Sequence, residues 1–212
     1  MGMLNQIVNI LEDRNIFVRQ RKSNKTKSLA LLIYQAGLSY RKTSKIIGEI
    51  ESFSYEALRK WYNKCRNIFH PEKKVRRVVA IDETKVKKER RQLYLWNAID
   101  IDDKTILATH LSTSRTSFDA IYFLRMVLEQ CENKPLILVD RGPWYRWSLQ
   151  RLGLEYKHET FGWRTSIEQW YSQFKARVKR FWKRFPYRST LKSIKRWCLV
   201  WIAFYNFLLE VS

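Results

Sequence analysis

The spacing of apolar residues changes character part-way along the chain. Up to about residue 70 they recur every three or four positions, the period of helices that pack through one face. Gly37 is a helix stop, and serines precede two of the predicted helices as caps, at Ser39 and within Ser52–Ser54. The predicted helices are one within residues 1–25, then Lys27–Gln35, Tyr40–Ile47 and Tyr55–Ile68.

A proline and a run of charges at His70–Lys74 interrupt the helical pattern and predict a domain boundary. Beyond it come short runs rich in β-branched and aromatic residues, which are typical of strands, and helical periods separate the later runs. The charged segment Lys85–Arg91 predicts an exposed hairpin turn. The expected order is strands Val78–Ile81, Leu93–Ile99 and Thr105–Leu111, helix Ser117–Cys131, strand Leu136–Val139, helix Trp144–Leu152, strand Leu154–Lys157, a helix from Thr165 or Ser166 to Pro186, and helix Thr190–Leu209.

This order predicts an α/β (α+β) protein in which an N-terminal helical region precedes a mixed sheet flanked by helices. It is also the order of an RNase H-like fold, in which the first and fourth strands lie side by side. We therefore expect a helical region at residues 1–70, a sheet domain at residues 75–185, and a C-terminal helix at residues 186–212 that packs on the sheet domain.

The chain carries 41 Lys and Arg residues against 20 Asp and Glu residues, a formal charge of +21. Such an excess attracts polyanions, and its spread along the chain favours nucleic acid over a membrane surface. The sequence does not open with a basic segment, apolar core and cleavage site, so we do not expect secretion. The apolar stretch Trp197–Val211 is short for a membrane span and contains Asn206 and Glu210, which predicts a core helix.

The three cysteines stand alone, without the paired spacing of a disulfide framework or a zinc ribbon. This favours a reducing compartment. Together with the positive charge it predicts a cytoplasmic, nucleoid-associated protein.

Three of the predicted helices, with a tight turn before the second, match a helix-turn-helix unit at about residues 26–68. The third would be the recognition helix, with basic residues that contact DNA: Arg59, Lys60, Lys64 and Arg66. The alternative is a small helical bundle that only supports the following domain, because helical triplets are common and only the charge favours DNA.

Two predicted strands end in carboxylates, and a third carboxylate begins a basic helix. Asp82 follows the first strand, Asp140 follows the fourth, and Glu168 lies in the first turn of the helix. Carboxylate oxygens are the ligands that Mg²⁺ prefers, so these acids predict a metal site for in-line phosphodiester chemistry. Glu83 is set aside because strand alternation sends it to the opposite face.

Other acids are assigned elsewhere. Asp100, Asp102 and Asp103 are predicted to decorate a polar turn. Glu155 and Glu159 compete with Glu168, but neither begins a capped amphipathic helix.

The helix of Glu168 also carries basic residues that could hold a nucleic acid backbone passing the metal site: Lys175, Lys179 and Arg180. Lys175 follows Glu168 by seven positions and therefore lies on the same helical face. The alternative is a solvated basic face, although the helix has an apolar side as well.

The sequence resembles a small bacterial or archaeal insertion-sequence transposase of the DDE type, and is most similar to insertion-sequence family six. The matching segments are Gly37–Arg41 with Trp61, Asp82–Thr84, Tyr94–Asp100, Val139-Asp140 and Ile167–Gln169, and Lys175 fits a basic position of the family. The resemblance covers about residues 26 to 185. The spacing from Asp140 to Glu168 is 168 − 140 = 28 positions, which is shorter than usual for the family.

This resemblance implies an RNase H-like core, two Mg²⁺ ions that Mn²⁺ can replace, and DNA strand cleavage and transfer. It implies that Asp82, Asp140 and Glu168 are the catalytic triad and that the protein assembles on DNA as a homo-oligomer, a dimer. Two other classes stay open: a DNA-binding protein without catalysis, such as a decayed element or a repressor, and a nuclease that cleaves without joining.

Overall fold

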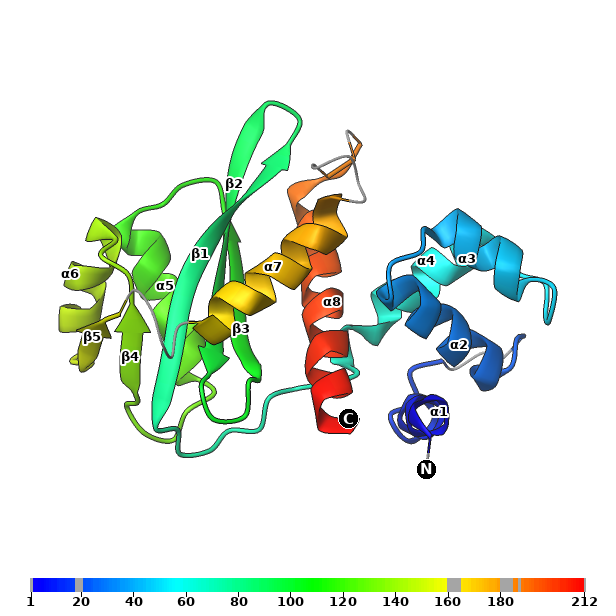
Figure 1. Ribbon diagram of the computed structural model, residues 1–212, viewed down its shortest axis with the longest axis horizontal. Helices are drawn as coiled ribbons and strands as arrows, with labels where there is room; N and C mark the ends of the chain where they lie inside the picture. The colour runs from blue at the N-terminus through cyan, green and yellow to red at the C-terminus, as the bar shows by residue number, and fades with distance from the viewer. Residues whose placement is uncertain (1, 18–20, 160–164, 180–184, 187, 212) are drawn as a thin grey trace. The chain divides into compact units, whose positions relative to one another are not determined.

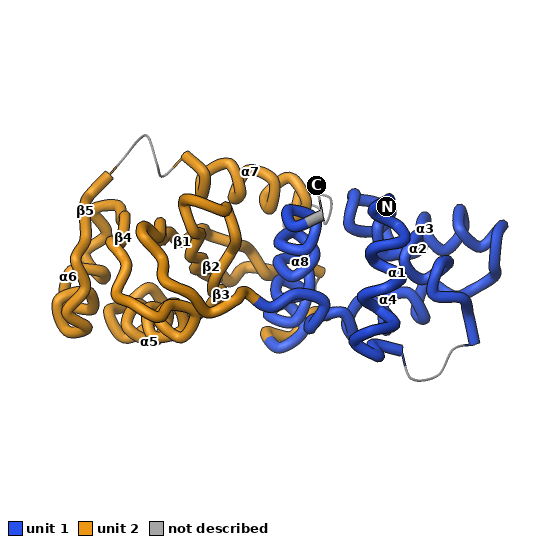
Figure 2. Tube along the Cα trace, turned by 90° about the horizontal axis from the view of Figure 1, so that it is seen from below, with its two compact units in different colours: residues 1–70, 192–212 blue, residues 71–191 orange. Residues whose placement is uncertain are grey.

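The computed structural model describes residues 2–17, 21–159, 165–179, 185–186 and 188–211. The chain forms two compact units (Figure 2). Unit 1 contains residues Met1–His70 together with Lys192–Ser212, and unit 2 contains Pro71–Leu191. The C-terminal segment therefore belongs to the same unit as the N-terminal helices.

Unit 1 is helical, as the period of its apolar residues predicts. Serine caps begin two of its helices: the Ser39 side chain accepts a hydrogen bond from the Lys42 amide, and the Ser54 side chain accepts one from the Ala57 amide. The helix predicted at Tyr55–Ile68 ends earlier, at Lys64, and is followed by a 3₁₀ turn at Cys65–Asn67. The helices are α1 (Met3–Asp13), α2 (Asn24–Gln35), α3 (Tyr40–Ile47), α4 (Tyr55–Lys64) and α8 (Leu191–Val211).

Helix α8 contacts the N-terminal helices through aromatic side chains. The Trp197 indole donates a hydrogen bond of 2.9 Å to the Tyr34 hydroxyl. The ring of Phe204 stacks on that of Tyr62 at 5.7 Å between centroids. Local periodicity does not reveal this pairing of the aromatic face of α8 with the tyrosines of α2 and α4, and the packing of the C-terminal helix on the sheet domain stays a prediction.

Unit 2 contains a five-stranded sheet in the order β3-β2-β1-β4-β5. The β1–β2 and β2–β3 pairs are antiparallel, whereas β1–β4 and β4–β5 are parallel. This is the RNase H-like order, and it confirms the predicted fold class and the adjacency of the first and fourth strands. The strands are β1 (Val78–Lys88), β2 (Arg91–Asp100), β3 (Ile106–Ser112), β4 (Leu136–Val139) and β5 (Tyr156–His158).

Strand β1 extends beyond the acidic residues where the sequence predicted its end. The segment assigned to a turn continues the β1–β2 ladder as far as the pair Lys88↔Arg91, and the turn itself is confined to residues 89–90. Val86 is buried while its neighbours Lys85 and Lys87 are exposed, which is the alternation of a half-buried strand. The predicted hairpin is therefore present, but its turn is tighter and its arms are longer.

Helices cover both faces of the sheet (Figure 1). Helices α5 (Ser117–Leu128) and α6 (Pro143–Arg151) pack on one face and share a buried core with the strands that includes Val79, Trp96 and Phe123. Helix α7 (Thr165–Lys179) crosses the other face and contacts β1 and β2. The apolar run of β1 ends at Ile81 and β4 ends at Val139, and both points lie between α6 on one face of the sheet and α7 on the other.

Within the described part of the chain, none of the helices has the length and apolarity needed to cross a membrane. The C-terminal stretch predicted as a core helix accordingly forms α8, with Ile194, Cys198 and Phe207 buried.

Candidate active site

The adjacent acids Asp82 and Glu83 leave strand β1 on opposite faces of the sheet. Asp82 pairs across the ladder with Asn97, whose side chain contacts helix α7, and Glu83 pairs with Trp96, whose ring packs beside α6. Residues opposite each other in a ladder share a face, so Asp82 faces α7 and Glu83 faces α5 and α6. The alternation predicted for these two residues is confirmed.

Asp140 lies directly beyond the last residue of β4, which runs parallel to β1. Ligand oxygens of Asp82, Glu83 and Asp140 all lie within 4.8 Å of one another. Asp140 lies beyond the end of β4, and its carboxylate is close both to Asp82 on one face of β1 and to Glu83 on the other. Glu83 therefore belongs to the cluster, although strand alternation had been taken to exclude it. The predicted proximity of Asp82 and Asp140 is confirmed.

The chemistry of this cluster fits a hard divalent cation. Its donors are carboxylate oxygens, which suit Mg²⁺ or Mn²⁺, and all three residues have intermediate exposure. Main-chain amides orient two of them: Glu83 N donates to Asp82 Oδ1 at 2.9 Å, and Gly142 N donates to Asp140 Oδ1 at 2.8 Å. One oxygen of each aspartate is thus held by the backbone.

Only 4% of the Glu83 side chain is exposed. The Tyr145 hydroxyl donates to Glu83 Oε2 at 2.6 Å, and Arg115 Nη1 donates to Oε1 at 3.1 Å. Burial raises the pKa of the Glu83 carboxyl above its ordinary value, and the charge of Asp140 adds to this, while the Tyr145 and Arg115 hydrogen bonds oppose it. No sequence signal singled out Tyr145 or Arg115, because neither belongs to a recognisable motif.

Helix α7 is joined to β1 beside the acidic cluster by Tyr171. The buried Tyr171 hydroxyl lies 2.6 Å from the main-chain oxygen of Asp82 and 3.2 Å from that of Leu95, and it accepts a hydrogen bond from Asn97 Nδ2 at 3.3 Å. Burial, followed by the charge of Asp82, raises the pKa of Tyr171 well above its ordinary value, so the hydroxyl remains a donor.

Glu168 lies in the first turn of α7, as predicted, and is exposed. It is not a member of the three-carboxylate cluster among the described residues. Its position is one turn before Tyr171 on the same face, and residues three apart on a helix are neighbours. Thr165 and Ser166, which were predicted as caps, are already inside the helix.

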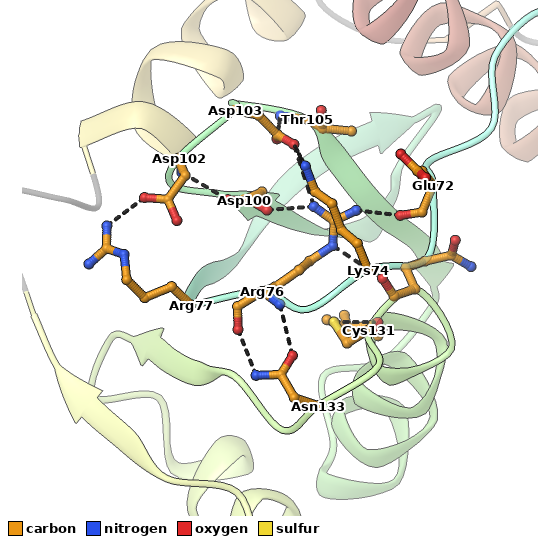
Figure 3. Close-up of polar contacts among 12 residues, drawn as sticks. Glu72, Lys74, Arg76, Arg77, Asp100, Asp102, Asp103, Thr105, Cys131 and Asn133 are labelled. Carbon is orange, nitrogen blue, oxygen red and sulfur yellow. Dashed lines mark hydrogen bonds and ion pairs between the residues drawn. The ribbon is translucent and has the colours of Figure 1, made fainter.

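The remaining acids are engaged elsewhere. Glu159 Oε2 lies 3.8 Å from the Lys157 ammonium, and Glu155 is exposed. The aspartates at the end of β2 and in the turn that follows pair with basic residues of the segment leading into β1: Asp100 with Arg76, Asp102 with Arg77, and Asp103 with Lys74 (Figure 3). The predicted assignment to a polar turn is confirmed for Asp102 and Asp103, whereas Asp100 is the last residue of β2 and is buried, because its carboxylate pairs with the buried Arg76.

The basic residues named from the sequence are exposed wherever the structure describes them. On α7 these are Lys175 and Lys179, and the Lys175 ammonium lies 5.9 Å from the centre of the Tyr171 ring. Arg180 lies outside the described residues. In unit 1 the exposed residues are Arg59, Lys60, Lys64 and Arg66, of which Arg59 is ion-paired with Glu56 one turn earlier.

Comparison with known sequences identifies relatives over most of the chain. A family described as the DDE domain, of IS240-type transposases, matches residues 76–203. The uncharacterized protein MJ0017 of Methanocaldococcus jannaschii is 41% identical over 201 residues, covering 94% of this chain and 94% of that protein. The uncharacterized protein aq_aa24 of Aquifex aeolicus is 39% identical over 59 residues, which are 28% of this chain and 49% of that protein.

Among solved structures, the chain is similar to a chain of the simian T-cell lymphotropic virus intasome in complex with PP2A regulatory subunit B56 gamma, at 13% identity and a TM-score of 0.47 over 74% of this chain and 63% of that chain. It is also similar to the HTLV-2 integrase catalytic core domain in complex with magnesium, at 14% identity and a TM-score of 0.44 over 63% of this chain and 86% of that chain. At these levels of identity the likeness concerns the fold alone.

Proposed function

Because this chain belongs to the DDE-domain family of IS240-type insertion-sequence transposases, we propose that it binds the terminal repeats of an insertion sequence and catalyses metal-dependent DNA strand cleavage and transfer. The observation that carries the proposal is the convergence of Asp82, within β1, and Asp140, directly after the neighbouring strand β4. Carboxylates gathered in this way repel one another, and a bound cation relieves that repulsion.

Asp82, Asp140 and Glu168 are the proposed catalytic triad, and they would hold two Mg²⁺ ions, which Mn²⁺ could replace. When bound, such ions activate the attacking oxygen and stabilise the leaving oxygen of an in-line phosphodiester displacement. The protein's own contribution is to orient the carboxylates. Main-chain amides hold the side chains of Asp82 and Asp140, and Tyr171 joins α7, the helix of Glu168, to the main chain of Asp82.

The proposed reaction has two steps on the same site. Water first attacks a phosphodiester at the end of the element and displaces its 3′ oxygen, so that the cut strand gives one product with a 5′-phosphate and one with a new free 3′-hydroxyl. That hydroxyl then attacks a phosphodiester of the target DNA, forming a new bond and releasing a target 3′-hydroxyl. Because one bond replaces another, the transfer step needs no external energy source.

DNA would be held by both units. In unit 1, α2, α3 and α4 are the proposed helix-turn-helix, with α4 presenting Lys60, Lys64 and Arg66 as phosphate or base contacts. In unit 2, the exposed Lys175 and Lys179 continue along α7 from Glu168 and would bind the backbone of the strand being cut. Two ends must be joined to one target, so we expect a dimer to assemble on the DNA.

The test is cleavage of a labelled duplex containing the terminal repeat by the full-length chain, with Mg²⁺. Asp82→Asn and Asp140→Asn should each abolish cleavage and leave DNA binding intact or tighter, because the repulsion of phosphate by carboxylate is reduced. Asp102→Asn is the matched control: this exposed aspartate forms a surface ion pair with Arg77, and cleavage should continue.

The outcomes separate the proposal from its two rivals. Retained cleavage in Asp82→Asn or Asp140→Asn would remove that residue from the site. Binding of the terminal repeat without cleavage by the unaltered chain would identify a DNA-binding protein, and cleavage without joining to a target duplex would identify a nuclease.

A further inference from the structure

The turn after β4 carries Asp140 and passes directly into helix α6. Glycine at position 142 allows this turn to be compact: a Cβ atom there would lie 2.7 Å from the Trp144 ring and 2.9 Å from Asp140 Oδ1. Both approaches are shorter than real Cβ contacts allow. The Trp144 ring and the Asp140 carboxylate therefore both lie close against the backbone of Gly142.

One hydrogen bond joins this segment to the strand that carries Asp82. The Tyr145 hydroxyl, at the start of α6, donates to Glu83 Oε2 at 2.6 Å. Tyr145 is fully buried, and its ring packs edge-on against Trp96 of β2 at 5.7 Å between centroids. Glu83 directly follows Asp82 in β1. This hydrogen bond therefore links α6, and with it the turn of Asp140, to the part of β1 that carries Asp82.

Arg115 holds the same turn from a second direction. Its guanidinium donates to Glu83 Oε1 at 3.1 Å, and the guanidinium carbon lies 3.8 Å from the centre of the Trp144 ring. Arg115 is placed by the start of α5, where the following residue, Thr116, forms a capping box with Asp119. Both oxygens of Glu83 are therefore engaged with groups that border the Asp140 turn.

We propose that Glu83 is a positioning residue, which acts with Tyr145 and Arg115 to hold the Asp140 turn so that Asp82 and Asp140 face one cation. Three observations carry this role: both Glu83 oxygens accept from donors, its side chain is almost wholly enclosed, and its partners are Tyr145 of α6 and Arg115, which contacts the Trp144 ring of α6. The inference rests on the proposed metal-dependent function. Mutation of a residue that orients a metal ligand by a hydrogen bond typically weakens metal affinity by roughly 10- to 100-fold.

The experiment measures binding of Mn²⁺ to the full-length chain by the loss of the free Mn²⁺ electron paramagnetic resonance signal. Tyr145→Phe removes one hydroxyl and leaves every carboxylate and the net charge unchanged. It should weaken Mn²⁺ binding by about 10- to 100-fold. Tyr122→Phe is the matched control, because Tyr122 is 53% exposed on α5, and its Mn²⁺ affinity should equal that of the unaltered chain.

A charge-balanced double variant, Glu83→Gln with Arg115→Gln, separates positioning from direct ligation. An amide oxygen at position 83 can still accept the Tyr145 hydrogen bond, so a positioning role predicts Mn²⁺ binding that is weakened by the loss of the Arg115 contacts but remains measurable, and stronger than in Asp82→Asn. Urea unfolding of each variant, followed by circular dichroism, verifies that the chain is folded under the binding conditions.

Each outcome bears on one proposal. Absence of Mn²⁺ binding by the unaltered chain would overturn the metal-dependent function itself. Binding by the unaltered chain together with unchanged affinity in a folded Tyr145→Phe would overturn only the positioning role. Loss of binding in the double variant as complete as in Asp82→Asn would make Glu83 a ligand, and would also overturn it.

Discussion

The Tyr171 hydroxyl lies 2.6 Å from the main-chain oxygen of Asp82, so a buried hydrogen bond ties the helix of one proposed catalytic residue to the strand of another. Glu168 precedes Tyr171 by one helical turn, and Lys175 follows it by one. This contact helps to hold α7 on the sheet, together with the buried apolar side chains Ile167, Trp170 and Phe174 of the same helix.

Tyr171→Phe should reduce strand cleavage and destabilise the chain. The variant leaves the amide of Asn97 and the oxygens of Asp82 and Leu95 without their shared partner, and a lost buried hydrogen bond costs about 1–3 kcal/mol in the free energy of unfolding. Urea unfolding and duplex cleavage are the two measurements, with Tyr122→Phe as the exposed control. Unfolding and cleavage identical to those of the unaltered chain would show that the contact does not hold α7.

Glu168→Gln should silence cleavage while Glu159→Gln leaves it unchanged. Glu168 begins the helix that Tyr171 fixes beside Asp82, whereas Glu159 lies beside Lys157 after β5. Both replacements remove one negative charge and keep the side-chain shape, so each controls for the other. Cleavage of the labelled terminal duplex decides the matter, and the reverse pattern of activity would transfer the third catalytic position to Glu159.

Lys60→Ala should weaken DNA binding and make it less dependent on salt. Lys60 is exposed on α4, and each phosphate that a lysine neutralises contributes about one unit to the slope of log affinity against log salt concentration. Fluorescence anisotropy of the full-length chain on a duplex at several salt concentrations gives that slope. Arg77→Ala, at an arginine paired with Asp102, should keep it, and an unchanged slope in Lys60→Ala would place this lysine away from the phosphates.

Arg76→Met should destabilise the chain by about 3–5 kcal/mol, because it leaves the buried carboxylate of Asp100 without its partner. The two side chains are 1% and 3% exposed, so water cannot replace the lost ion pair. Addition of Asp100→Asn to Arg76→Met should restore part of the loss, since no unpaired charge remains. Urea unfolding measures both, and a single variant as stable as the unaltered chain would show that the pair does not stabilise unit 2.

The sequence by itself determined the elements and most of the acids. Apolar runs that stop at Asp82 and Asp140 predict where the buried part of each strand ends, because a charged side chain must leave the core where water or a cation can reach it, although β1 itself continues to Lys88. Serine caps predicted the starts of α3 and α4, since the interaction spans only three residues. The order of strands and helices then sufficed for the fold class and for the adjacency of β1 and β4.

Tertiary structure alone decided which residues surround the acids. Glu83 lies close to Asp140 because β4 ends one residue before Asp140. The partners of Glu83 are Arg115, which precedes α5, and Tyr145 of α6. Tyr171 meets Asp82 across 89 positions of sequence, and α8 meets α2 through Trp197 and Tyr34 across 163. Periodicity shows which face of an element is buried, but not which other element buries it, because that choice depends on shape and hydrogen bonding between segments far apart in the chain.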